Sequence, residues 1–220
     1  MAFMKKQMLL PILFLFAGIG CANDDSGHSV QEPIQNAEAV QDEASSNERQ
    51  MIDETMQLIQ GYAAEWGVPT DLNRIPIVVT SKRLDLNASS QCIYRGSVGI
   101  KMLVQKQFFT ERVYEKDSGY ASPLFNLLVH EIGHCYMLRK HEDALLRKNG
   151  YKAQFVIQSN KGNEKVEYYS VQASMMHNQY FRMPQLLEKY YVGEIFGKFR
   201  AKTLDDLQKY YSFELVQDRR

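Results

Sequence analysis

The stretch Leu127-Leu128-Val129-His130-Glu131-Ile132-Gly133-His134-Cys135-Tyr136-Met137-Leu138 decides how the rest of this chain is interpreted. His130 and His134 are four residues apart, so a helix places them one turn apart on the same face. Two imidazoles in this arrangement can bind one Zn²⁺, each at about 2.0–2.1 Å. Glu131 lies about 100° around the helix from His130, where it could act as general base on a water that the metal holds. The surrounding apolar residues predict a buried helix, in which two histidines and a glutamate need a metal or dedicated partners.

The composition bounds the class of protein. The chain has 220 residues, which is enough for one domain with a short appendage. Its 45% of hydrophobic and 24% of charged residues are typical of a soluble globular protein. The formal net charge is zero, so we expect no nucleic acid partner.

Residues 1–21 have the features of an export signal. Two lysines precede an apolar run over residues 8–19, which is too short to span a bilayer. The run ends at Gly20-Cys21, and a small residue before a cysteine at this place resembles a bacterial lipobox. We therefore expect Cys21 to carry a lipid anchor and the protein to be a cell envelope lipoprotein, periplasmic or on the outer surface. Cleavage after Ala22, which would release a freely secreted protein, is the alternative.

The segment that follows the signal is acidic. Residues 22–48 contain no lysine or arginine and almost no large apolar side chain, so they cannot bury enough surface to become ordered. We expect a flexible tether over residues 22–48 and a folded domain over residues 49–220.

Export also bears on the cysteines. Once Cys21 is lipidated or removed, Cys92 and Cys135 remain, and an even pair in an oxidising compartment predicts a disulfide. This bond would tie the histidine helix to the segment around Cys92. The alternatives are that one of the two cysteines is a metal ligand, or that both are buried free thiols.

The remaining patterns predict alternating helices and strands. Ser122-Pro123 is a typical start for the histidine helix, with Ser122 as N-cap. We expect further helices over residues 51–59, 103–114, 185–191 and 204–211, strands over 75–80, 92–94, 97–102 and 151–159, and turns at Arg95-Gly96 and Asn149-Gly150.

Two separated motifs resemble the metzincin clan of zinc peptidases. They are His130-Glu131-x-x-His134 with the later His141, and Ser174-Met175-Met176-His177 downstream. In that clan three histidines bind zinc, the glutamate is the general base, and a turn places a methionine beneath the metal. The resemblance, over residues 70–185, implies that His141 is the third ligand and Met176 that methionine. It also implies a zincin-like α+β fold, with a small mixed sheet packed on the active-site helix and helices at the C-terminus.

The sequence departs from the clan in two places. The clan has a glycine three residues and a histidine six residues after the second histidine, whereas Met137 and Lys140 stand there and His141 follows one residue later. The competing third ligands are Glu164, Glu167, Glu142 and Asp143. Some members place a tyrosine two residues after the methionine, where this chain has Asn178, and Tyr180 is the candidate to replace it.

These features predict an exported zinc-dependent endopeptidase that acts on a peptide or protein substrate. Glu131 would take the proton of a zinc-bound water, and Tyr180 would help to stabilise the oxyanion. An extended substrate would pair with the edge of the sheet, which we expect at residues 97–102. The alternative is a membrane-tethered binding or structural lipoprotein with a vestigial or structural zinc site. Glu131 favours the enzyme, because a structural site has no use for a base.

Overall fold

The structure is a computed structural model, which describes residues 40–69, 71–82, 84, 88–96, 98–111, 119–158, 164–177 and 183–218. All of them belong to the unit Ile34–Arg220. The predicted signal at residues 1–21, its Cys21, most of the predicted tether and Tyr180 lie outside the described residues. Among the described helices, none is both long and apolar enough to cross a membrane.

The folded part begins earlier than predicted. Helix α1 (Ser46–Glu65) starts with a capping box, in which the Ser45 side chain accepts from the Glu48 backbone and the Glu48 carboxylate accepts from the Ser45 backbone. Before it, Glu43 N donates to Val79 O at 2.9 Å, and Val40 is buried. The predicted boundary at residue 49 was therefore wrong. The acidic composition before it predicted a flexible tether, but these residues include the cap of α1 at Ser45 and a segment that bonds to strand β1 at Glu43.

The first sheet contains β1 (Ile77–Thr80), β2 (Ser90–Arg95) and β3 (Val98–Gln105) in the order β1-β3-β2. The predicted hairpin at Arg95-Gly96 is present, with β2 antiparallel to β3, while β1 runs parallel to β3. Gly96 has a φ of 63°, which suits a glycine at the turn.

Two predictions about this sheet were wrong. Residues 103–105 belong to β3, helix α2 covers Phe108–Glu111, and residues 112–114 lie outside the described residues. Met102, Leu103 and Val104 are all fully buried, and a continuous buried apolar run has no period that separates strand from helix. Strand β3 is also central, so it cannot be the open edge that we expected at residues 97–102.

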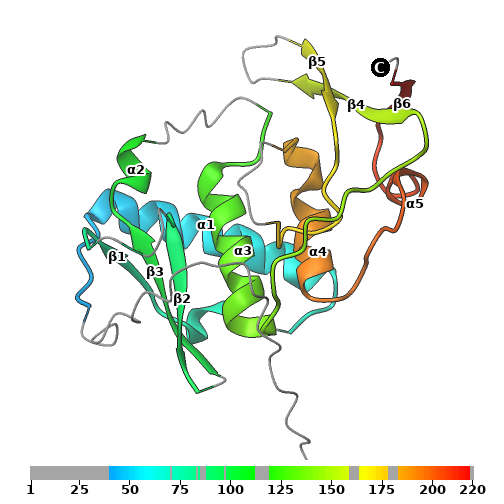
Figure 1. The fold of residues 1–220 in the computed structure, drawn as a ribbon. Coiled ribbons are helices and arrows are strands. Elements are labelled where there is room, and N and C mark those ends of the chain that lie inside the picture. Colours follow the sequence, from blue (N-terminus) through cyan, green and yellow to red (C-terminus); the bar gives the residue numbers. More distant parts are fainter. Residues whose placement is uncertain are drawn as a thin grey trace, which may run out of the picture. The chain divides into compact units, whose positions relative to one another are not determined.

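Helix α3 (Pro123–Met137) lies between this sheet and α4 (Glu188–Ile195), and α1 also packs against it (Figure 1). Its N-cap is Ser122, whose hydroxyl accepts from Phe125 N at 3.0 Å, with Pro123 in the first turn as predicted. Gly99 of β3 approaches α3 so closely that a Cβ there would lie 2.6 Å from Cys135 O. The sequence thus places the histidine helix at the centre of the domain, with the sheet held tightly against it.

Among the described residues, the C-terminal half adds a second sheet and three helical segments. Strand β4 (Tyr151–Gln158) pairs antiparallel with β5 (Glu164–Tyr169) and with β6 (Glu214–Gln217). The helical segments are η4 (Gln185–Leu187), α4 and α5 (Leu204–Gln208), and a further short turn, η2 (Leu72–Arg74), precedes β1. The fold is therefore mixed α/β with small sheets and a few helices, which agrees with the predicted α+β class.

Helix α4 is fixed in position by its packing on α1. Trp66 follows α1 and its indole N–H donates to Lys189 O at 2.8 Å. Gly193 lies under this indole ring, and a Cβ there would lie 2.5 Å from ring atoms. Tyr190 and Tyr191 are fully buried on the same helix. This packing sets the position of Glu194 on the same helix.

Candidate metal centre

Three histidines converge at one point of the structure. His130 and His134 come from adjacent turns of α3, and His141 comes from the chain that follows the helix. Their Nε2 atoms form a nearly equilateral triangle, with separations of 3.1 Å for His130 to His134 and 3.2 Å for each of them to His141. Among the described residues, these three form the group of metal-capable side chains that are close enough to share an ion.

The hydrogen bonds of two rings fix which nitrogen faces this point. His130 Nδ1 lies 2.8 Å from Met175 O, and His134 Nδ1 lies 2.7 Å from Arg139 O. A carbonyl oxygen can only accept, so each Nδ1 carries a proton and each neutral ring presents the lone pair of its Nε2. Lone pairs aimed at one another at this distance repel, and a cation between them removes the repulsion.

The spacing also fits a metal ion. Three nitrogens at about 2.0–2.1 Å from one tetrahedral ion lie roughly 3.3 Å from each other. The observed separations of 3.1–3.2 Å are close to this value. We conclude that the three rings could hold a metal ion with little rearrangement.

Burial keeps the rings in the state that binds metal. Burial, together with the neighbouring histidines, lowers the pKa of His130 to about 4, against the opposing effect of the Met175 hydrogen bond. Burial also lowers the pKa of His134. Both rings are therefore neutral at pH 7, as metal ligands must be.

The chain reaches His141 through an unusual helix end. Leu138 terminates α3 in the left-handed region, with φ 51° and ψ 32°. Among the described residues other than glycine, it is the one with a positive φ. Arg139 N then donates to Gly133 O at 3.0 Å, which turns the chain back along the helix. In the metzincin pattern the helix ends at a glycine, at the position of Met137, and the third histidine stands at the position of Lys140. Here the left-handed residue and the histidine both come one residue later, at Leu138 and His141. The extra residue is absorbed by extending the helix.

Glu131 directly follows His130 on α3 and is buried. Its side chain accepts at Oε1 from Ser90 Oγ at 2.7 Å, and the residue is 4% exposed. Its other oxygen, Oε2, is buried without a hydrogen-bond partner in the described part of the chain. Burial raises the pKa of Glu131 to about 7, against the opposing effect of the Ser90 hydrogen bond. An unpartnered buried carboxylate oxygen is suited to accept a proton.

Met176 lies against the helix at the level of the histidines. It is fully buried, and a Cβ at Gly133 would collide with its sulfur. Its carbonyl accepts from Glu142 N at 2.7 Å, which ties the segment after His141 to this turn. The structure therefore brings the segment around Met176 against the same stretch of α3 that carries both histidines.

Glu194 is a residue that the sequence reasoning missed. Its fully buried carboxylate pairs with Arg139 Nη2 at 2.6 Å and accepts from Ser174 Oγ at 3.1 Å and from Met175 N at 3.4 Å. Arg139 and Met175 are the residues whose carbonyls hold His134 and His130. One carboxylate thus positions both carbonyls, although it comes from a helix 55 residues beyond Arg139. No local pattern in the sequence could have indicated it.

Three of the four competing third ligands have other partners. Glu142 pairs with Arg200 and lies 3.6 Å from Arg139. Glu167 pairs with Lys165 and accepts from the Tyr169 hydroxyl. Asp143 lies 3.5 Å from His177 Nε2, and the side chain of Glu164 is outside what the structure describes.

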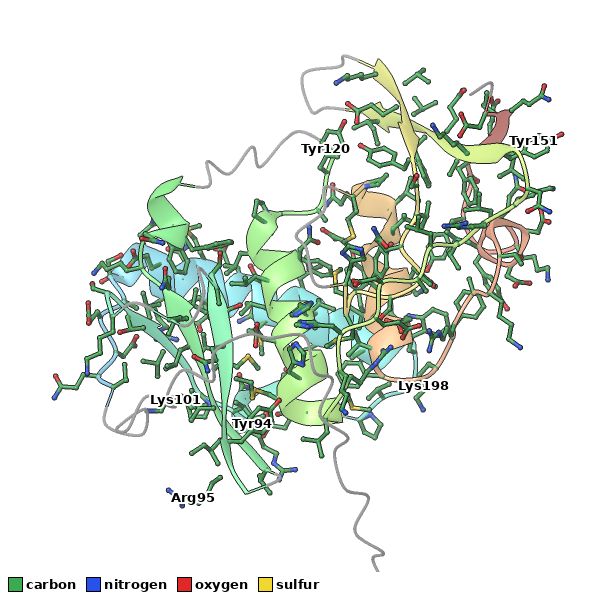
Figure 2. All side chains as sticks on the ribbon, viewed as in Figure 1. Tyr94, Arg95, Lys101, Tyr120, Tyr151 and Lys198 are labelled. Atoms are coloured by element: carbon green, nitrogen blue, oxygen red, sulfur yellow. A yellow bond between two sulfur atoms is a disulfide. The ribbon has the colours of Figure 1, made fainter. Side chains whose placement is uncertain are left out.

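A disulfide joins Cys92 to Cys135, with a Cα–Cα distance of 5.6 Å. Both cysteines are buried. The bond ties β2 to α3 at the residue directly after His134. Tyr94 and Arg95 follow Cys92 on the same strand, toward the hairpin turn (Figure 2). Neither cysteine is therefore a metal ligand or a free thiol in this structure.

Comparison of the chain with protein-family models, with curated proteins and with solved structures finds no match to any of them.

Proposed function

We propose that this chain is a zinc-dependent endopeptidase of the bacterial cell envelope. The observation that carries the proposal is the combination of three converging Nε2 atoms with the buried carboxylate of Glu131, the residue after His130, which keeps one oxygen without a partner in the described residues. The envelope location rests on the predicted export signal and on Cys21. The zincin-like fold and the metzincin-like roles of His141 and Met176 belong to the same proposal.

The donor set favours zinc. Three neutral imidazoles and one open position are typical of catalytic zinc, whereas magnesium and calcium prefer oxygen ligands. A zinc ion held by His130, His134 and His141 would supply a Lewis acid that polarises a peptide carbonyl and acidifies a water molecule.

The proton transfers fall to Glu131. Its Oε1 is engaged by Ser90, so Oε2 takes the proton of the attacking water. The same oxygen then gives this proton to the nitrogen of the leaving amine as the C–N bond breaks. Burial assists both steps, because a carboxylate with a pKa near 7 holds and releases a proton with little cost at neutral pH.

Strand β2 is the candidate edge for the substrate. In the described residues it pairs with β3 along one side, and its other side remains open to an extended peptide. The opposite edge of the sheet is covered, because residues 42 and 43 bond to Val79 of β1. We therefore place the substrate pairing on β2, and not on residues 97–102 as the sequence predicted.

The rival function, a binding or structural lipoprotein with a closed metal site, needs a fourth protein ligand. The metal-capable group in the described residues has three members. No described feature favours the rival, and the unpartnered oxygen of Glu131 has no role in it.

The test is metal-dependent hydrolysis. The full-length chain should contain close to one zinc ion, cleave members of a pooled peptide library, lose this activity to a chelator and regain it with zinc. His141→Ala should lose zinc far more readily than the matched control Glu167→Ala. Zinc-loaded protein that cleaves nothing in the library, or the reverse order of the two variants, would reject the proposal.

A further inference from the structure

Helix α3 and strand β2 are joined by two contacts, whose spacing along the strand matches their spacing along the helix. Ser90 bonds to Glu131, and Cys92 bonds to Cys135. Two residues along a strand advance about 6.7 Å, and four residues along a helix advance about 6.0 Å. Ser90 and Cys92 therefore lie on the face of β2 that is turned toward α3, and Glu131 and Cys135 lie on the face of α3 that is turned toward β2. The two spacings are nearly equal. The disulfide fixes the register in which Ser90 reaches Glu131.

The close packing of the hairpin leaves little freedom to this register. Gly99, which pairs with Tyr94 across the hairpin, lies directly against the backbone of Cys135. The disulfide is buried beside it. Ser90 is accordingly held opposite Glu131 by covalent and steric contacts on the same face of α3.

The Ser90 hydroxyl decides which carboxylate oxygen is engaged. It donates to Oε1 at 2.7 Å, while Oε2 remains without a partner among the described residues. The terminal torsion of a glutamate is broad, so an unrestrained carboxylate would exchange its two oxygens and tilt. We propose that Ser90 is a positioning residue, which holds the Glu131 carboxylate so that Oε2 faces the reacting water. This inference rests on the proposed function.

A purely stabilising role for Ser90 makes different predictions. If the hydroxyl only satisfied a buried carboxylate, its loss would lower stability and leave turnover by the folded protein unchanged. If it positions Glu131, its loss lowers kcat while zinc content and KM stay the same, because the ligands are unchanged and an extended substrate would pair with the backbone of β2, which a change of the Ser90 side chain leaves in place.

The experiment compares three variants of the full-length chain. Ser90→Ala removes the hydroxyl, Ser90→Thr restores it, and Ser89→Ala removes the hydroxyl of the preceding serine, for which no hydrogen bond is described. On the best peptide from the library, kcat of Ser90→Ala should fall by roughly ten- to a hundredfold with zinc retained. Ser90→Thr and Ser89→Ala should stay within about threefold of the wild type. Unchanged kcat in Ser90→Ala, or failure of Ser90→Thr to restore it, would overturn the proposal.

A second measurement does not depend on activity. In urea unfolding, Ser90→Ala should raise the unfolding equilibrium constant by about tenfold in the wild type and far less in Glu131→Leu, since the bonded partner is then gone. Equal effects in the two backgrounds would show that the contact is absent in solution and would overturn the positioning role. Wild-type protein that shows this coupling and binds zinc but cleaves no peptide would refute the proposed function instead, and the positioning role with it.

Discussion

Replacing Glu194 tests whether the two carbonyls behind the histidines are held by one carboxylate. In Glu194→Gln the size is kept, but the charge beside Arg139 is lost, and the amide cannot accept at both ends. One end must accept from Arg139, so the other presents N–H groups to Ser174 Oγ and Met175 N, which now donate to the carboxylate. The Glu194 side chain is fully buried and that of Arg139 is 20% exposed.

The expected loss follows from these contacts. Breaking a buried ion pair by removing one partner costs about 3–5 kcal/mol, and we expect the lower end because Arg139 keeps some contact with solvent. The displaced carbonyls of Arg139 and Met175 should also orient His134 and His130 less well, which we expect to weaken zinc binding by roughly 10–100-fold.

Urea unfolding of the metal-free protein measures the first effect, and zinc titration against a chelating indicator measures the second. Glu188→Gln is the matched control. Glu188 is a buried carboxylate at the start of the same helix, and it accepts from the Tyr62 hydroxyl instead of bonding near the histidines. It should leave zinc affinity unchanged. Zinc affinity of Glu194→Gln equal to that of the wild type would refute the proposed link between this carboxylate and the histidines.

Three further predictions concern other parts of the fold. Leu138→Gly should raise the free energy of unfolding by about 0.5–1 kcal/mol, because Leu138 has positive φ and is largely exposed, and relief of strain should exceed the entropy that glycine loses; a destabilised variant in thermal unfolding would contradict this. Burial raises the pKa of Glu188 from 4.5 to about 7, so the folded state holds this proton between those values and stability falls as pH rises through that window; Glu188→Gln should flatten this part of the stability profile, and an unchanged slope would argue against it. Mass spectrometry of unreduced peptides should link Cys92 to Cys135, and reduction should lower stability by about 2–4 kcal/mol; two freely alkylated thiols in protein from the envelope would exclude the bond.

The parts of the fold that the sequence predicted correctly depend on local patterns. Ser122 and Pro123 predict the start of α3, and Gly96 predicts the turn of the hairpin. The four-residue spacing of His130 and His134 predicts that their rings lie close together. Each of these signals lies within a few residues of the structure that it specifies.

The parts that were missed depend on contacts distant in the sequence. Ser90 is 41 residues from Glu131, and Glu194 is 55 residues from Arg139, so neither position has a local signature. The central place of β3 follows from its pairing with β1, which is not visible in its own residues. Strand β5 contains exposed Val166 among polar residues and gives little alternation to detect.

The most direct test of the central claim is peptide hydrolysis by Glu131→Gln, with zinc counted in the same sample. The variant keeps the size of the side chain and can still bond to Ser90, but it cannot take a proton at Oε2. We predict that zinc content stays at that of the wild type while hydrolysis falls by at least about 10²–10⁴-fold. Hydrolysis at the wild-type rate would contradict the role of Glu131 as general base, and loss of zinc would show that Glu131 is itself a ligand.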